Sequence, residues 1–208
     1  MASAEPMRYP GIRLLVFAKA PVPGQVKTRL LPILDASGAA ALHAGLVADS
    51  IRRFTAKPLC PVELHCAPDA EHPLFQALAR QYPIQCRAQQ GRDLGERMGH
   101  AVAQTLAAGH WPLLVGTDCP LLDAGVLVEA CEALMAGHDA VLGPAEDGGY
   151  VLLGLRRSAP ELFQDVEWGT ERVLATTRQR LRDRGWDWRE LPSLWDLDRP
   201  QDLFRYHA

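Results

Sequence analysis

The chain has 208 residues, of which 48% are hydrophobic and 23% are charged, and its formal net charge at pH 7 is −3. These proportions are typical of ordinary globular proteins and exclude a disordered or membrane-embedded chain. The 22 Lys and Arg residues are scattered, so nucleic acid and anionic lipid are not expected partners, and a small-molecule partner is expected.

The length allows one α/β domain over residues 1–208, with residues 1–11 expected to be flexible. No segment approaches the roughly 20 apolar residues of a membrane-spanning helix, and the first residues lack the apolar core of a signal peptide. We therefore expect a cytoplasmic protein. The five cysteines are spread along the chain without a C-x-x-C pair, which predicts structural thiols rather than a disulfide framework or a zinc site.

The apolar pattern predicts strands that alternate with helices. Ile12 to Ala18 is a short branched and aromatic run typical of a buried strand, and Leu42 to Phe54 shows the apolar spacing of a helix. Further strands are expected at 62–66, 84–87, 111–116, 140–143, 150–155 and 188–191, and further helices at 71–82, 94–108, 126–135, 171–184 and from residue 200. This alternation predicts a three-layer α/β/α, Rossmann-like fold with a mostly parallel central sheet and a ligand site at the carboxyl ends of its strands.

A cationic loop follows the first predicted strand. Lys19, Lys27 and Arg29 lie on a segment with two prolines and one glycine. Lysine supplies a compact charge and arginine a planar donor fork, so the three side chains together could neutralise a diphosphate. The alternative is a solvated basic loop without a ligand. A P-loop is excluded, because Val26 stands where that motif needs a glycine.

Acidic residues mark a second candidate site. Asp118 follows the strand expected at 111–116, where a carboxylate suits a divalent cation that also binds substrate phosphates. The alternative is that Asp118 caps the next helix, for which Asp123 is also a candidate cap. Asp196 and Asp198 share one side of an extended segment, so either could complete a metal site with Asp118, or Asp198 only caps the last helix.

Glycine-containing segments form a third set of candidates. Glu146 to Tyr150 combines two acids and two glycines between apolar strands, which suits close approach to a ligand and equally a plain hairpin turn. Gly91 to Arg97 has the pattern of a helix start with paired charges. Trp168 to Thr170 has the pattern of a substrate-facing loop, with Thr170 as the expected helix cap.

Five segments together resemble a bacterial family of GT-A-type glycosyltransferases: V-F-A-K-A-P-V-P-G-x-V-K-T-R-L, G-x-D-L-G-E-R-M, G-T-D-C-P, G-P-A-E-D-G-G-Y and D-L-D-R-P-Q-D-L. The resemblance covers nearly the whole chain and implies the nucleotide-diphospho-sugar transferase (GT-A) fold. Some members are associated with arsenosugar biosynthesis, and more distant relatives include molybdenum-cofactor and phospholactate guanylyltransferases.

The motifs and the resemblance imply roles for individual residues. The expected catalytic residues are Asp118 and Lys27, and the expected ligands of a Mg²⁺ or Mn²⁺ ion are Asp118 and Asp198. The residues expected to face the nucleotide are Ala18, Lys19, Ala20, Gly24, Lys27, Arg29, Gly95, Arg97 and Thr117. The residues expected to face the acceptor are Glu146, Asp147, Gly148, Gly149, Tyr150, Trp168, Gly169 and Thr170.

Three functions are compatible with these residues. The first is glycosyl transfer from a nucleoside-diphosphate sugar to a small acceptor, with the metal ion stabilising the departing diphosphate. The second is nucleotidyl transfer, in which a phosphorylated acceptor attacks a nucleoside triphosphate and pyrophosphate leaves; it stays open because the D-x-D motif of glycosyltransferases is missing before Asp118. The third is a nucleotide-binding module without catalysis, since no general base is evident.

Overall fold

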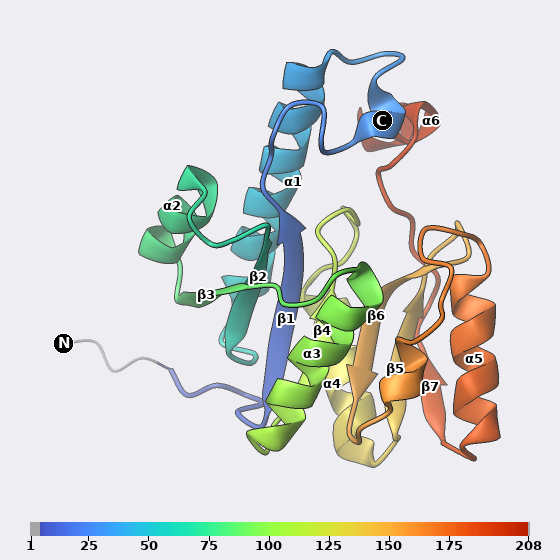
Figure 1. Ribbon diagram of the computed structural model, residues 1–208. Coiled ribbons are helices and arrows are strands. Elements are labelled where there is room, and N and C mark those ends of the chain that lie inside the picture. Colours follow the sequence, from blue (N-terminus) through green and yellow to red (C-terminus); the bar gives the residue numbers. More distant parts are fainter. Residues whose placement is uncertain (1–4, 208) are drawn as a thin grey trace.

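The computed structural model describes residues 5–207, which form a twisted central sheet covered by helices on both faces (Figure 1). The strands are β1 (Ile12–Lys19), β2 (Val62–Ala67), β3 (Ile84–Ala88), β4 (Trp111–Val115), β5 (Ala140–Pro144), β6 (Tyr150–Leu155) and β7 (Trp188–Glu190). The helices are α1 (Ala36–Thr55), α2 (Pro73–Gln81), α3 (Leu94–Ala107), α4 (Ala124–Ala136), α5 (Val173–Asp183) and α6 (Pro200–His207), with short 3₁₀ turns η1 (Thr28–Leu30) and η2 (Pro160–Leu162). Each predicted strand and helix is present, and the two 3₁₀ turns were not predicted.

The strand order is β3-β2-β1-β4-β6-β5-β7, and β6 runs antiparallel to both of its neighbours while the remaining pairs are parallel. The predicted α/β fold with a mostly parallel sheet is therefore confirmed. The chain builds outward from β1 to β3 and then returns to place β4 on the other side of β1. Loops that follow β1 and β4 thus diverge at this switch point, where open α/β sheets form their ligand crevice.

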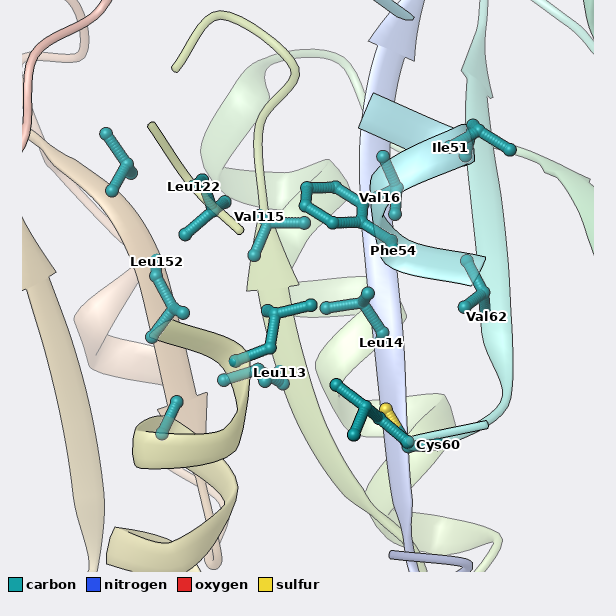
Figure 2. Packing of buried hydrophobic residues seen from close by; sticks show 14 of the residues in the cluster. Leu14, Val16, Ile51, Phe54, Cys60, Val62, Leu113, Val115, Leu122 and Leu152 are labelled. Atoms are coloured by element: carbon teal, nitrogen blue, oxygen red, sulfur yellow. The ribbon is translucent and has the colours of Figure 1, made fainter. Parts of the chain in front are cut away.

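Alternating residues of β1 pack against helices on opposite faces of the sheet. Leu14 and Val16 belong to the core formed with α1, α2 and α4, whereas Leu15 belongs to the core formed with α3 and α5. Figure 2 shows Phe54 of α1 beside Val16 and Val115. Burial of each such large side chain contributes about 1.5–3 kcal/mol, so the sheet is held from both sides.

The first described residues pack onto this domain. Tyr9 is 7% exposed and donates its backbone N–H to Leu59, and the Arg8 N–H bonds to the carbonyl of Pro58. The Arg8 side chain also pairs with Glu132 at 2.7 Å. Of the segment 1–11 that was expected to be flexible, residues 1–4 lie outside the described residues, and its later part is bonded to the loop before β2. Among residues 5–207, none of the helices is both long and apolar enough to cross a bilayer.

The last helix brings the end of the chain back to the beginning. Trp195 and Leu197 pack with Leu30 and Leu46 in a small core of their own, and α6 lies beside the start of α1 (Figure 1). Ala145 forms an isolated parallel bridge with Leu194. The segment between β7 and α6 therefore crosses the ends of β1, β4 and β5, where the candidate residues lie.

Candidate functional site

A cleft of about 670 Å³ opens at the carboxyl ends of β1 and β4. Most of the residues singled out from the sequence line it, although they come from distant parts of the chain. These are Ala18, Lys19, Lys27, Arg29, Arg97, Thr117, Asp118, Asp147, Gly149, Tyr150, Trp168, Gly169, Thr170 and Asp198. The candidates were chosen from loops that follow strands, because α/β sheets bind ligands at the carboxyl ends of their strands, and most of these candidates line this cleft.

Lys27 is a buried cation inside this cleft. Its side chain is 2% exposed, and its Nζ lies 2.8 Å from Asp118 Oδ1 and donates to the backbone carbonyl of Leu197 at 2.5 Å. The residue adopts a left-handed backbone conformation with φ of 50°, which costs a non-glycine residue about 1–2 kcal/mol. The loop therefore directs Lys27 inward, and this lysine is not the solvated loop cation of the alternative interpretation.

Arg29 and Asp198 form a second ion pair beside the first. Arg29 Nη1 lies 2.5 Å from Asp198 Oδ2, and the two side chains are 53% and 32% exposed. The start of α6 is capped instead by Asp202, whose Oδ2 accepts the N–H groups of Asp198 and Arg199 at 3.0 and 2.7 Å. The Asp198 carboxylate thus faces the cation loop and does not cap the helix. Lys27, Arg29, Asp118 and Asp198 are called the charged side of the cleft below.

Asp118 does not cap the helix that follows it, so that alternative is wrong. Helix α4 begins at Ala124, and Asp123 Oδ1 accepts the N–H groups of Gly125 and Val126 at 2.8 and 3.0 Å. This confirms Asp123 as the cap. The Asp118 carbonyl accepts the N–H of Leu197 at 2.8 Å. Its carboxylate therefore remains directed at Lys27 and the cleft.

Helix α1 fixes the loop that carries Asp118. Arg53 donates to the carbonyls of Pro120 and Leu122 at 2.5 and 2.7 Å and to that of Cys119 at 3.3 Å. A planar guanidinium can bond several carbonyls at once, which a lysine ammonium does less well. Arg53 thus positions the loop after β4 from a helix more than sixty residues earlier, a role that the helical pattern did not reveal.

His43, also on α1, bonds the end of β1 and lies near the carboxylate of Asp118. Its Nε2 lies 3.0 Å from the Lys19 carbonyl and therefore donates, and its Nδ1 lies 3.8 Å from Asp118 Oδ1. Burial lowers the pKa of His43, and the neighbouring Asp118 carboxylate opposes this effect. The sequence pattern gives no sign of His43, because this residue lies within an apolar helical repeat.

Carboxylates gather at the base of the cleft. Burial, together with the neighbouring carboxylates of Asp118 and Asp147, raises the pKa of Asp196 to about 7. Within residues 5–207, no group of three or more His, Cys, Asp or Glu side chains is close enough to form a complete metal cage. Mg²⁺ is commonly held by one or two carboxylates together with substrate phosphates, so Asp118 and Asp198 fit such an ion.

The β5–β6 hairpin forms the opposite wall. Ala145 and Gly149 close the turn with a backbone hydrogen bond of 3.0 Å, and Asp147 Oδ1 accepts the Gly149 N–H at 2.9 Å. Gly148 has a φ of +87°, and a Cβ placed there would lie 2.3 Å from the Glu171 carbonyl oxygen. The turn can press against the start of α5 only with glycine at this position.

Aromatic residues complete this wall. The rings of Tyr150 and Trp168 meet edge to face with their centroids 6.4 Å apart, and burial raises the pKa of the Tyr150 hydroxyl. A Cβ on Gly95 would lie 2.7 Å from Trp168 Nε1, so this glycine admits the indole against α3. Residues 147–150 and 168–170 are called the aromatic side of the cleft below.

Thr170 was expected to cap α5, but this prediction is wrong: Thr170 belongs to the loop before the helix. The N-cap position is Arg172, and it has no side-chain cap. Thr170 Oγ1 donates to the Glu167 carbonyl at 2.7 Å and accepts from the Arg172 N–H at 3.4 Å. The hydroxyl therefore braces the turn that carries Trp168.

A few expected residues do not line the cleft: Ala20, Gly24, Gly95, Glu146 and Gly148. Gly95 and Gly148 act through packing, as described above, and Gly24 has a φ of +77° in the loop turn. Glu146 points away from the cleft to Arg205 of α6, with contacts of 2.7 and 3.0 Å.

His43 and Gln89 also line the cleft, although the sequence had not pointed to them, and so does Asp196, the other candidate acid beside Asp198. Gln89 follows β3 and donates to the carbonyls of Ala18 and His65 at 3.3 and 2.7 Å. Its position directly after a strand was the available signal. For His43, inside a helix, no comparable signal exists.

The sequence and structure match known proteins in two ways. A family model described as "Uncharacterized protein conserved in bacteria (DUF2064)" matches residues 50–170. A crystal structure from Desulfovibrio desulfuricans G20, described as a proposed nucleotide-diphospho-sugar transferase, is 32% identical with a TM-score of 0.82, and the match covers 91% of this chain and 83% of that one. No curated protein sequence matches the chain.

More distant structures share the fold alone. The 4-diphosphocytidyl-2C-methyl-D-erythritol synthase of Anaerococcus prevotii DSM 20548 is 8% identical with a TM-score of 0.60, over 94% of this chain and 96% of that one. A CMP:2-keto-3-deoxy-manno-octonic acid synthetase in complex with CTP is 11% identical with a TM-score of 0.58, over 95% and 97%. These likenesses agree with the nucleotide-diphospho-sugar transferase fold.

Proposed function

The chain belongs to the bacterial DUF2064 family, and we propose that it is a metal-dependent transferase that moves a glycosyl group from a nucleoside-diphosphate sugar to a small acceptor. The protein is a transferase that uses a nucleotide-activated donor. One observation carries the proposal: three cations from the loop after β1 and two acids, one from the loop after β4 and one from the segment before α6, meet in one cleft at the switch point of the sheet.

The charged side supplies the donor site in this proposal. Lys27 and Arg29 bind the two phosphates, and Lys19 lines the same cleft. Each charge-assisted hydrogen bond from a cation to phosphate contributes about 1.5–3 kcal/mol. The burial of Lys27 and its hydrogen bond to Leu197 hold the ammonium in place, so little side-chain entropy is lost when phosphate binds.

The metal is Mg²⁺ or Mn²⁺ in this proposal, held by Asp118 and Asp198. When bound, such an ion stabilises negative charge on the departing diphosphate. The crowding of Asp118, Asp147 and Asp196 supports a cation here, because a positive ion reduces repulsion among neighbouring carboxylates.

The aromatic side supplies the acceptor site. Tyr150 and Trp168 offer ring faces and edges for an organic acceptor, and Asp147 and Thr170 offer polar contacts beside them. A small-molecule acceptor fits a cleft of about 670 Å³ that also receives the donor. The proposal includes the cytoplasmic location expected from the sequence, which cell fractionation would test.

Donor turnover tests the proposal directly. The protein is incubated with nucleoside-diphosphate sugars of different base and sugar, with Mn²⁺ or with a chelator, and release of nucleoside diphosphate is measured. We expect slow metal-dependent hydrolysis of one donor class even without an acceptor. Saturable nucleotide binding without turnover of any donor would support a binding module instead and would contradict glycosyl transfer.

Nucleotidyl transfer is the second candidate, because the loop after β4 carries a single acid, Asp118, and Gly116 stands where a D-x-D motif has its first acid. In that reaction an acceptor phosphate attacks the α-phosphorus of a nucleoside triphosphate and pyrophosphate leaves. Incubation with nucleoside triphosphates and sugar phosphates, followed by a pyrophosphate assay, distinguishes the two reactions. Metal-dependent pyrophosphate release would favour this second candidate.

A further inference from the structure

The charged side pairs its cations and its acids one to one. Lys27 lies 2.8 Å from Asp118, and Arg29 lies 2.5 Å from Asp198. Under the proposed function, the two cations bind phosphate and the two acids bind a divalent ion. Each cation that would bind phosphate is therefore paired with an acid that would bind the metal ion.

We propose that these two ion pairs make the site selective for the complex of a divalent cation with a nucleoside diphosphate, and discriminate against the free cation and the free nucleotide. The inference rests on the proposed function, because it assumes that both ligands bind on the charged side. It goes further in naming the species that the site accepts and the residues that impose the selection.

The selection follows from charge balance in a pair whose lysine is buried, although the Asp118 side chain is 41% exposed. A divalent cation that binds Asp118 alone displaces Lys27, whose ammonium is 2% exposed and then faces a second positive charge with little water to screen it. A nucleotide that binds Lys27 alone leaves Asp118 beside the negative phosphates. When both ligands bind, Lys27 moves its contact to phosphate and Asp118 moves its contact to the metal, so each charge keeps an opposite partner.

Arg29 and Asp198 add a second, weaker element of the same kind. Their side chains are 53% and 32% exposed, so water screens this pair more than the first. Coupling of this type is reciprocal: the factor by which nucleotide raises metal affinity equals the factor by which metal raises nucleotide affinity. The ion pairs lower the affinity for each ligand alone and therefore increase that factor.

Removing one partner of an ion pair should release the other, which gives an unusual expectation. Arg29→Gln frees Asp198 and should raise the affinity for Mn²⁺ alone by about two- to fivefold, the range for an exposed ion pair. Asp198→Asn frees Arg29 and should raise nucleotide affinity in metal-free buffer by a similar factor. Lys27→Met should raise the affinity for Mn²⁺ alone by about tenfold, because its pair is more buried.

The experiment measures Mn²⁺ binding by electron paramagnetic resonance, and nucleotide binding by calorimetry. The nucleotide probe is whichever of ADP, CDP, GDP and UDP binds the unaltered protein most tightly in the presence of Mn²⁺. Arg8→Gln is the matched control, since it makes the same charge change in an exposed 2.7 Å ion pair with Glu132 far from the cleft. It should leave the affinity for Mn²⁺ and for nucleotide unchanged. Thermal unfolding of each variant verifies that it is folded.

The outcomes separate the inference from the proposed function. If Mn²⁺ and nucleotide bind together but Arg29→Gln fails to tighten Mn²⁺ alone and Asp198→Asn fails to tighten nucleotide alone, the selection mechanism is overturned and the transferase proposal stands. If no nucleotide binds the unaltered protein with or without Mn²⁺, the proposed function fails and the inference fails with it. Arg29 is exposed, so its variant tests the mechanism even if Lys27→Met does not fold.

Discussion

The two sides of the cleft are held in place by different means. On the charged side, ion pairs and side-chain hydrogen bonds from α1 fix the loops, as when Arg53 binds three backbone carbonyls of the segment after Asp118. On the aromatic side, backbone passes close to backbone at glycines, and rings fill the remaining space. Charge therefore defines the donor side, and shape defines the acceptor side. Substitutions on the two sides should have effects of different kinds.

The largest expected effect is on the charged side, at Asp118. Asp118→Asn keeps the size of the side chain and an oxygen that Lys27 can still bind, but it removes the charge that a divalent cation needs. We expect metal-dependent turnover to fall about 100- to 1000-fold, as when an electrostatic contact to a transition state is lost. The free energy of unfolding should fall by only about 1 kcal/mol. Turnover within threefold of the unaltered protein, measured with saturating Mn²⁺, would exclude Asp118 from the site.

On the aromatic side, the largest effect should be on stability. Gly148→Ala forces a Cβ to within 2.3 Å of the Glu171 carbonyl at a φ of +87°, so we expect a loss of about 2–4 kcal/mol in unfolding free energy. Gly185→Ala is the matched control, since its φ is +62° and a Cβ there meets nothing within 4 Å. It should cost about 1 kcal/mol. Equal losses in denaturant titrations of the two variants would show that close packing does not position the turn.

A smaller effect should follow from loosening the charged side without touching its charges. Arg53→Lys keeps the positive charge but cannot bond the carbonyls of Pro120 and Leu122 with one planar group. We expect metal-dependent nucleotide affinity to fall about three- to tenfold and unfolding free energy to fall by about 1–2 kcal/mol. Arg52→Lys, at an exposed neighbour paired with Asp49, should change neither quantity. Loss of stability with unchanged nucleotide affinity would make Arg53 purely structural.

The smallest expected effect concerns the acceptor. Trp168→Phe shortens the ring that meets Tyr150 and should weaken acceptor binding by about 0.5–1.5 kcal/mol, the range for an aromatic contact. Donor affinity should not change, because Trp168 lies on the aromatic side of the cleft and packs against Tyr150. Once an acceptor is known, steady-state kinetics would show a higher KM for acceptor with an unchanged KM for donor. A raised donor KM would contradict the division of the cleft into two sides.

The sequence predicted the fold well because its signals are local. The apolar run that became β1 and the helical repeat that became α1 needed no distant partner to be recognised. The loops that follow strands located most of the cleft for the same reason. The Asp123 cap was likewise readable from a few neighbouring residues.

Features that depend on distant contacts could not be predicted. Lys27 donates to the carbonyl of Leu197, which lies 170 residues later in the chain. Glu146 points away from the cleft and forms an ion pair with Arg205 of α6. His43 and Arg53 lie among apolar residues of a helix, and the apolar spacing that predicts the helix does not show that these two side chains bond to other loops. Sequence patterns thus located the region of the site but not its internal pairing.

The bonds made by Leu197 also have a consequence for biosynthesis. Its N–H donates to the Asp118 carbonyl and its own carbonyl accepts from Lys27, so one residue late in the chain links two loops that are synthesised much earlier. A ribosome that adds 5–20 residues per second needs roughly 4–16 s to pass from residue 118 to residue 197. During that interval the growing polypeptide can already form β1 to β4, yet its donor site lacks the closing segment. A nascent chain should therefore gain nucleotide affinity only after Leu197 has been added, when most of the sheet has already formed.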